Sequence, residues 1–349
     1  DSLLSNGFED VYFPFRTLSV SLNRESKVFM NSEGCRIRST ISRVGFRAIA
    51  VSLYQGRSRS ISIPEGYSGA GGTGGWEVIE GMNLNETLPV KAKEIARALK
   101  ATATPPSEET SVILGPNVAS LTSHESVGHP FEADRILGRE GAQAGESYLN
   151  RSALGYRLGS PEANVSDDPS LPGSMGFYLY DDEGVKARKR KLIVAGIVTE
   201  LLQNRETAPI FGTESNASAR ATGFNREPII RMANTYIEPG DWDADELIRD
   251  TKHGVYIKSF MEWNIDDKRL NQRYVGLEAY LIENGELTSA LNQPAFEITT
   301  PKYWSSINAR AKDLQFYEGV CGKGDPMQGA PVYFGAPHIR LSGIKVGSR

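Results

Sequence analysis

The segment HESVGH, at positions 124–129, contains the side chains of this chain best suited to catalysis. Zinc peptidases commonly carry two histidines four positions apart on a helix, with a glutamate after the first, because both imidazoles then reach one ion. Here the second histidine comes one position later. On a regular α-helix, positions five apart are separated by about 140°, against about 40° for positions four apart. Either the two histidines do not share an ion or the helix is not regular.

A single π-helical turn would bring the two histidines back to one face, because its hydrogen bonds join residues five apart. Gly128 lies inside the candidate turn, and glycine tolerates a distorted backbone. The chain has four histidines, and two of them lie here, beside Glu125 and ahead of Glu132 and Asp134. This concentration favours a metal site. Two ordinary half-buried histidines on a helix are the open alternative.

A catalytic zinc site requires a third protein ligand and an open coordination position. Cys321 lies in a glycine-rich stretch that could approach a metal, and a thiolate is a good zinc ligand. A small buried side chain is the alternative role for Cys321, and packing or hydrogen bonding is expected of the two histidines outside the motif. The candidates for the third ligand are Glu132, Asp134, His253, His338 and Cys321.

Composition restricts the class of protein. The 349 residues carry a net charge of −4 and the pI is about 5.8, which argues against a nucleic-acid-binding protein. No stretch approaches the roughly 18 apolar residues of a membrane span, and the first residues lack the features of a signal peptide. Two cysteines provide no disulfide framework, as expected in a reducing compartment. We therefore expect a cytoplasmic protein that binds neither nucleic acid nor membrane.

The first third of the chain alternates between strand and helix patterns. Alternating residues between 16 and 63 predict antiparallel strands with one solvent-facing side. The glycine-rich residues 66–77 predict a mobile surface loop. Apolar spacing over 88–106 predicts a helix that ends at the two prolines, where we place a domain boundary. The expected domains are an N-terminal α+β domain, 1–106, and a C-terminal metallopeptidase domain, 107–349.

The remainder of the chain is expected to position the motif. Residues 111–122 predict a strand and a turn that lead into the motif as the start of a helix. Residues 140–175 predict long loops, and short strands return after them. The basic run KARKRK, at 186–191, follows three acidic residues and is interpreted as a solvated turn rather than an anion site.

Four blocks of the sequence, taken together, resemble one protein family. HESVGHPFEAD, at 124–134, is similar to the HExxxH segment of the TldD/PmbA family. Three later blocks resemble its C-terminal segments in the same order: RMANTYIEPGD at 231–241, YLIENGEL at 280–287 and GVCGKGDPMQGAPVYFGAPHIRLSGIKVG at 319–347. Shorter similarities at NSEG, DDEG and NRETA extend the resemblance over nearly the whole chain.

The resemblance implies an α+β fold of two domains, mainly antiparallel sheets with a metal-binding helix. Within the family, the TldD branch is a zinc peptidase, and the PmbA (TldE) branch lacks the HExxxH residues. Position by position, the resemblance implies His124, His129 and Cys321 as ligands of Zn²⁺. It also implies Glu125 as the catalytic base.

Residues around the motif leave questions that the resemblance does not answer. Glu132 and Asp134 are candidates to orient His129, and solvent-facing carboxylates are the equally good alternative. The residues 321–328 differ from the family's usual C-G-K-x-G-Q, which leaves the role of Gln328 open. The chain also resembles family members only from part-way into their N-terminal domain.

The resemblance implies a zinc-dependent peptidase that hydrolyses unfolded or extended peptides. It also implies a dimer, either a homodimer or a heterodimer with a PmbA/TldE-like paralogue. In the reaction, Glu125 would take a proton from water and pass it to the leaving amine. The alternative is a non-catalytic regulatory or binding subunit, as the family's older description as a modulator of DNA gyrase suggests. The intact motif argues against this alternative, because a scaffold needs none of its residues.

Overall fold

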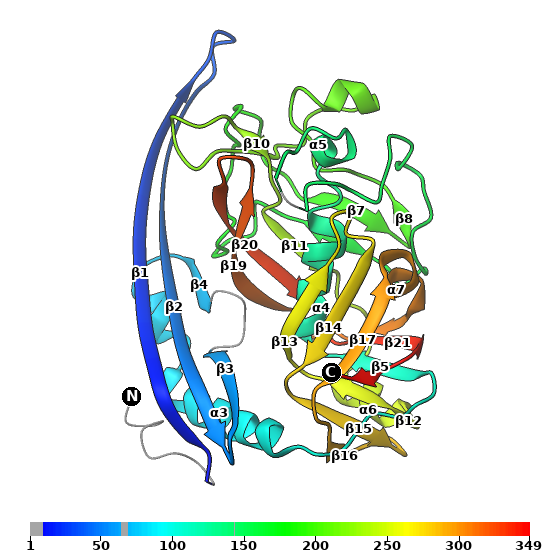
Figure 1. Ribbon diagram of the computed structural model, residues 1–349. Helices are drawn as coiled ribbons and strands as arrows, with labels where there is room; N and C mark the ends of the chain where they lie inside the picture. Colours follow the sequence, from blue (N-terminus) through cyan, green and yellow to red (C-terminus); the bar gives the residue numbers. More distant parts are fainter. Residues whose placement is uncertain (1–9, 64–68, 143) are drawn as a thin grey trace.

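The computed structural model describes residues 10–63, 69–142 and 144–349. Strands dominate, and a short buried helix, α4 (Pro116–Ser123), lies in the middle of the C-terminal part (Figure 1). A long curved sheet forms the N-terminal part beside it. The α+β class expected from the sequence is therefore confirmed.

The N-terminal sheet is built around one long hairpin, which runs along the edge of the molecule in Figure 1. Its strands β1 (Tyr12–Met30) and β2 (Arg36–Tyr54) are antiparallel over almost their full length. β3 (Arg57–Ile63) and β4 (Ala70–Thr73) both pair with β2. The expected antiparallel strands between 16 and 63 are therefore present.

Two helices cover the apolar face of this sheet. They are α2 (Glu77–Glu80) and α3 (Leu84–Lys100), and α3 matches the helix expected before the two prolines. Every second residue of β2 points to the helices, and α3 contributes residues three or four apart, so both periodicities meet in one core. That core includes Val44, Phe46, Ala48 and Ala50 from β2, and Leu88, Ala92, Ile95, Ala96 and Leu99 from α3.

The prediction of a mobile surface loop over 66–77 is wrong for Ala70–Thr73 and for Glu77, where α2 begins. Residues 66–68 lie outside the described residues, and Ala70–Thr73 form strand β4. A Cβ atom on Gly71 would lie 2.4 Å from the Glu318 Oε2 atom and 2.4 Å from the Val44 carbonyl oxygen. Glycine therefore allows close approach of the N-terminal sheet to its neighbour, rather than flexibility.

Two six-stranded sheets form the C-terminal part. The one that carries Cys321 has the order β19-β20-β11-β6-β7-β8, and only β11 and β20 are parallel in it. Its strands are β6 (Val165–Asp167), β7 (Arg190–Val194), β8 (Ile197–Val198), β11 (Asn234–Ile237), β19 (Gln315–Lys323) and β20 (Gln328–Ala336).

The other six-stranded sheet supports the strand that leads into α4. Its order is β16-β15-β12-β5-β21-β18, with β5 and β12 parallel. Its strands are β5 (Thr110–Leu114), β12 (His253–Ile257), β15 (Ala279–Glu283), β16 (Glu286–Ala290), β18 (Ile307–Arg310) and β21 (Ile339–Ile344).

Smaller elements complete the fold. A four-stranded sheet has the order β13-β14-β17-β22, and β9 pairs with β10. These strands are β13 (Phe260–Ile265), β14 (Asn271–Gly276), β17 (Pro294–Thr299), β22 (Gly347–Ser348), β9 (Ala219–Arg220) and β10 (Ile229–Ile230). The remaining α-helices are α5 (Ala133–Ile136), α6 (Ala244–Asp250) and α7 (Thr300–Ser306). Within the described part of the chain, no helix is both long and apolar enough to cross a membrane.

The interpretation of the basic run 186–191 as a solvated turn is wrong for Arg190. This residue begins β7 and its side chain is fully buried. Its guanidinium pairs with the Asp167 carboxylate and donates to the Ser218 hydroxyl at 2.7 Å. A buried arginine needs such a partner set, because an unpaired charge in the interior is costly.

The contact between the N-terminal sheet and β19 buries an unpaired carboxyl group. Glu318 is 7% exposed, and among the described residues its Oε2 atom has no hydrogen-bond partner. Burial raises the pKa of Glu318 from 4.5 to about 7. The folded protein therefore keeps a proton that the unfolded chain releases, so stability falls as the pH rises from 4.5 through about 7.

We predict that Glu318→Gln removes this pH dependence. The variant should exceed the parent's unfolding free energy at pH 8 by up to about 3 kcal/mol, and the difference should shrink towards pH 4.5. Urea unfolding at both pH values measures this. Glu286→Gln, at an exposed position, is the control and should behave as the parent. An unchanged pH dependence in Glu318→Gln would contradict the prediction.

Candidate metal centre

A sharp turn after strand β5 starts the helix that carries the motif. Gly115 lies at the turn, where a Cβ atom would be 2.5 Å from the Lys258 carbonyl oxygen. Pro116 follows in the first turn of α4, where its missing N–H group costs nothing. The strand and turn expected over 111–122 are therefore a strand, a turn and a helix, and the backbone enters the motif already helical.

All eight side chains of α4 are buried, although four of them are polar. The three that carry hydroxyl groups donate back to carbonyl oxygens of the same helix: Ser120 to Asn117 at 3.0 Å, Thr122 to Val118 at 2.9 Å and Ser123 to Ser120 at 2.8 Å. This local bonding lets serine and threonine enter an apolar core without unsatisfied groups. The helix can therefore be buried on every side.

The helix changes to a π-helical turn at His124–Gly128. The His129 amide donates to the His124 carbonyl oxygen at 3.2 Å, which is the five-residue bond that the spacing of the motif requires. The two imidazole rings have centroids 4.9 Å apart and are nearly perpendicular. Gly128 is needed here because a Cβ atom would lie 2.7 Å from the Met232 sulfur. Of the two alternatives, a regular helix without a shared ion or an irregular helix, the structure has the irregular helix.

Strand β19 brings Cys321 to these imidazoles from 192 positions further along the chain. Its Sγ atom lies 3.2 Å from His129 Nε2. Ligand atoms of His124, His129 and Cys321 all lie within 4.8 Å of one another, and the three residues are buried. The packing of α4 on β19 and β20 therefore gathers two nitrogen donors and one sulfur donor in one place.

The charges around the cluster favour a thiolate. Burial raises the pKa of Cys321, but His129, the Arg231 guanidinium and His124 together lower it well below its ordinary value. Burial lowers the pKa of His124, and the neighbouring Cys321 raises it above its ordinary value. The thiolate is the form of cysteine that binds metals.

A buried ionic network lies behind His129. Its Nδ1 atom is 3.5 Å from Glu132 Oε2. Glu132 in turn receives Arg135 Nε at 2.6 Å and Lys323 Nζ at 3.1 Å. Burial raises the pKa of Glu132, but these two cations lower it well below its ordinary value. A carboxylate in this position can hold an imidazole with its other nitrogen directed at a metal.

Asp134 takes a different position from Glu132. Both of its carboxylate oxygens accept from Lys323 Nζ at 2.7 Å. The structure therefore places Asp134 on Lys323 and not on His129. Its contact with the imidazole is indirect, because Lys323 also binds Glu132.

Glu125 has its own cation, because it pairs with Arg269. Burial raises the pKa of Glu125, but Arg269, His124 and His129 together lower it below its ordinary value, so the carboxylate stays ionised. Arg269 has a positive φ of 59°, and its backbone is held by the Thr300 hydroxyl, which donates to its carbonyl oxygen at 2.7 Å. Glu125 is therefore a buried, ionised carboxylate next to the cluster.

A small cavity of about 120 Å³ opens beside the cluster. It gives a reacting group access to the buried side chains, and Trp263 and Phe334 form apolar parts of its wall. Four consecutive residues of β19, 319–322, also line it. Strand β19 therefore forms part of the cavity wall beside the cluster.

The other candidates for the third ligand lie elsewhere. His338 is a hydrogen-bonding histidine, as expected. Its Nε2 atom lies 2.8 Å from the Tyr256 hydroxyl oxygen and its Nδ1 atom lies 2.7 Å from Asp313 Oδ2. His253 is exposed at the start of β12. Gln328 holds a loop, since its side chain accepts from the Thr222 amide at 3.1 Å and donates to the Glu227 carbonyl at 3.0 Å.

The donor set fits zinc. Two imidazoles and one thiolate are common ligands of catalytic zinc, which leaves one of four positions open. Within the described residues, the buried His124 Nδ1 atom has no hydrogen-bond partner, and an unpaired buried nitrogen in a native site needs an explanation such as a metal ion. Fold and donor set together define an α+β protein with a candidate zinc site on an interrupted helix.

Comparison with known families agrees with this class. A profile of the PmbA/TldA metallopeptidase central domain matches residues 9–103, and a profile of the PmbA/TldA metallopeptidase C-terminal domain matches residues 107–348. The matches cover almost the whole chain. It belongs to the TldD/PmbA family.

Individual relatives carry metalloprotease names. A metalloprotease of Methanocaldococcus jannaschii is 36% identical over 314 residues, which are 90% of this chain and 66% of that protein. A zinc metalloprotease TldD homolog of Saccharolobus solfataricus is 33% identical over 272 residues, which are 77% of this chain and 58% of that protein. The chain thus spans between 58% and 66% of the length of these two relatives.

A solved structure shares the fold. TldE from Thermococcus kodakarensis superposes with a TM-score of 0.75, over 99% of this chain and 72% of that chain. The two sequences are 17% identical, so the likeness concerns the fold alone.

Sequence reasoning missed the cations that surround the motif. These are Arg135, Arg231, Arg269 and Lys323, all buried. Three of them lie 100 or more positions from the motif, and no local pattern distinguishes them from surface residues. Lys323 alone carried a signal, because it follows Cys321 by two positions and so points to the same side of β19.

We predict that Lys323→Met strongly destabilises the protein. The substitution leaves Glu132 and Asp134 buried without their shared cation, which costs about 3–5 kcal/mol in comparable sites. Urea unfolding measures the change. Lys345→Met, at an exposed position, is the matched control. A loss below about 0.5 kcal/mol in Lys323→Met would show that the network does not support the site.

Proposed function

We propose that the chain is a zinc-dependent peptidase in which His124, His129 and Cys321 bind the ion and Glu125 is the catalytic base. The observation that carries this proposal is the convergence of two imidazoles and one thiolate within 4.8 Å, beside a buried carboxylate. Membership of a metallopeptidase family supports it, as do the metalloprotease names of the relatives.

The chain's own residues divide the reaction between them. A bound zinc ion would supply the activation of water and the polarisation of a peptide carbonyl. Glu125, kept ionised by Arg269, accepts a proton from the attacking water and delivers it to the leaving nitrogen. Glu132 holds the His129 ring. The surrounding apolar core excludes bulk water from the buried side chains.

The substrate in this proposal is an unfolded or extended peptide. β19 is an edge strand, since it pairs with β20 alone among the described strands. The same strand lines the cavity with residues 319–322. An extended peptide can pair with such an edge through backbone hydrogen bonds and so place its own carbonyl group near the cluster.

We extend the proposal to the quaternary state. The protein would act as a dimer, with a second copy or with a TldE-like paralogue as its partner. The fold shared with TldE supports a common ancestor for such partners. A mixing experiment with the purified paralogue, read by analytical ultracentrifugation, separates the two forms.

The alternative function is a non-catalytic regulatory subunit. Such a subunit needs neither a metal site nor an ionised buried base. In such a subunit the buried Glu125 and its cation would have no function that offsets the free energy of burying them, because burying a charged pair seldom stabilises a protein. We therefore favour the peptidase.

We predict one zinc ion per chain. Elemental analysis of protein purified without chelators should give a ratio near one, and His129→Ala and Cys321→Ala should both lose the ion, because each removes a ligand. His253→Ala, at an exposed histidine outside the cluster, is the matched control and should keep it. Full zinc content in Cys321→Ala would refute the assignment of that residue.

The Glu125→Gln variant separates binding from chemistry. Glutamine keeps the size of the side chain but cannot accept the proton, so hydrolysis of an unstructured peptide library should fall by about 10²–10⁴-fold. Zinc content should stay near that of the parent. Mass spectrometry of the cleaved library measures the rate. Parental cleavage by Glu125→Gln would refute the assignment of Glu125 as the catalytic base, whereas no cleavage by the zinc-loaded parent would favour the regulatory subunit.

A further inference from the structure

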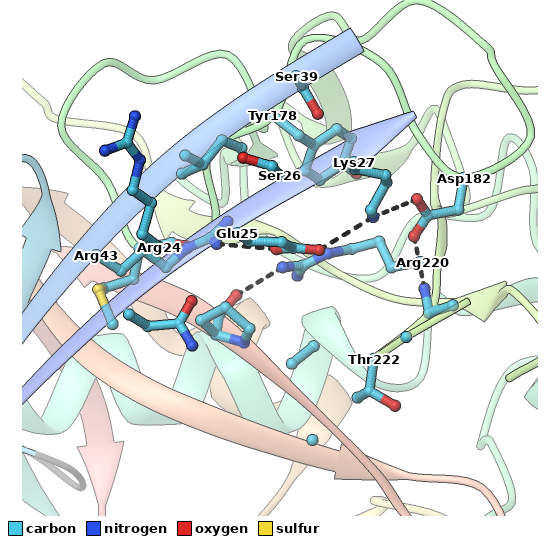
Figure 2. Close-up of a pocket in the computed structure, with 18 of the residues that line it drawn as sticks. Arg24, Glu25, Ser26, Lys27, Ser39, Arg43, Tyr178, Asp182, Arg220 and Thr222 are labelled. Atoms are coloured by element: carbon cyan, nitrogen blue, oxygen red, sulfur yellow. Dashed lines mark hydrogen bonds and ion pairs between the residues drawn. The ribbon is translucent and has the colours of Figure 1, made fainter. Parts of the chain in front are cut away.

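A second, larger cavity lies between the N-terminal hairpin and the C-terminal part (Figure 2). Its volume is about 670 Å³, within the range of about 300–1,000 Å³ that is typical of ligand sites. Strands β1 and β2 form one wall. Residues 220–224 and 329–331 belong to the opposite wall. We call it the arginine cavity, because Arg24, Arg43, Arg220 and Arg231 all line it.

Arg220 is a buried cation without an acidic partner. Its side chain donates to two backbone carbonyl oxygens, of Met232 at 2.8 Å and of Pro331 at 2.9 Å, and its guanidinium lies 5.4 Å from the centre of the Tyr178 ring. Among the described residues, no carboxylate lies within ion-pair distance of it. Burial lowers the pKa of Arg220 to about 10. A buried charge without an acidic partner destabilises the fold, so a native protein seldom keeps one unless it has a function.

Two more arginines add positive charge near Arg220. Arg43 and Arg231 lie close enough to lower the pKa of Arg220 further. Arg231 is 1% exposed, and its Nε atom has no hydrogen-bond partner among the described residues. The cations that line the cavity, Arg24, Lys27, Arg43, Arg220 and Arg231, outnumber its carboxylates, Glu25, Asp181 and Asp182, by five to three.

The three carboxylates of the cavity are engaged with other groups. Glu25 lies between Arg43, at 3.4 Å, and Lys27, at 3.5 Å (Figure 2). Asp182 binds Lys27 at 2.5 Å and accepts from the Ala221 amide at 2.7 Å. Asp181 accepts three backbone N–H groups. None of them neutralises Arg220.

The arginine cavity lies next to the candidate metal centre. Arg231 lines the cavity, and its guanidinium donates to the carbonyl oxygens of Cys321 and, at 2.8 Å, of Gln328. Pro331, in the wall of the cavity, and Val332, in the wall of the metal site, are neighbours on β20 and so point to opposite faces. The two sites therefore flank the same hairpin.

We propose that the arginine cavity binds a carboxylate group of a peptide. A carboxylate matches the planar donor geometry of arginine and would supply the missing acidic partner of Arg220. The cavity is much larger than an isolated ion needs, so the group that enters it is part of a longer molecule. The choice of a peptide as that molecule rests on the proposed function. The carboxylate is either the C-terminal one or that of an aspartate or glutamate side chain.

The test measures binding without cleavage, so it does not depend on the peptidase activity. Isothermal titration calorimetry with the Glu125→Gln variant compares three N-acetylated hexapeptides of alanine and glutamine. One has a free C-terminal carboxylate, one has an amidated end and a central glutamate, and one is amidated without glutamate. At least one of the first two should bind about tenfold or more tightly than the third. The tighter of them identifies the source of the carboxylate.

Two variants locate the binding site. Arg220→Met should abolish the preference for carboxylate, and Arg188→Met, at an exposed arginine paired with Glu200, should keep it. Where Arg220→Met does not fold, Arg220→Lys replaces it. Lysine keeps the charge but loses the planar donors, so the preference should fall severalfold.

A third variant excludes the metal centre as the binding site. His129→Ala disables that centre, and the carboxylate preference should persist in it. Loss of the preference in His129→Ala, equal binding of all three peptides, or an unchanged preference in the folded Arg220 variant would each overturn the proposal. Inorganic phosphate that binds in an Arg220-dependent manner, while no peptide does, would also overturn it.

Discussion

The site depends on the packing of the β19–β20 hairpin against the buried helix α4. His129 and Cys321 are 192 positions apart, and only this contact brings their side chains together. The register of the hairpin pairs Cys321 with Ala330. A slip by one residue would turn the thiol to the opposite face, towards the N-terminal sheet. The apolar core around α4 therefore also brings the three candidate ligands together.

The same packing determines the charges of the site. α4 is buried on all sides, so each acidic group near it requires a cation from another element. Arg269 supplies one to Glu125, and Lys323 supplies another to Glu132. Arg231 lies behind Cys321 and favours the thiolate. An ionised base and an ionised thiolate can thus exist in the interior, where each alone would be neutral.

Much of this arrangement could be predicted from the sequence, where the signal is local. The spacing of His124 and His129 allowed a shared ion only on an interrupted helix, which is present, and alternation indicated the strands of the N-terminal hairpin. Long-range pairing gives no such signal, which is why Arg269 was missed. The glycines in 70–73 led to a wrong prediction of a mobile loop, because their role is close packing against Glu318. Arg190 was wrongly predicted to be solvated, since a buried ion pair and a solvated charge look alike in a sequence.

The central claim is that two imidazoles and the Cys321 thiolate bind one zinc ion. X-ray absorption spectroscopy at the zinc edge tests it most directly, because sulfur lies at about 2.3 Å from zinc and nitrogen at about 2.0–2.1 Å. The account predicts one sulfur and two imidazole nitrogens around the ion, with the sulfur contribution lost in Cys321→Ser. A spectrum of the zinc-loaded parent without a sulfur ligand would contradict it.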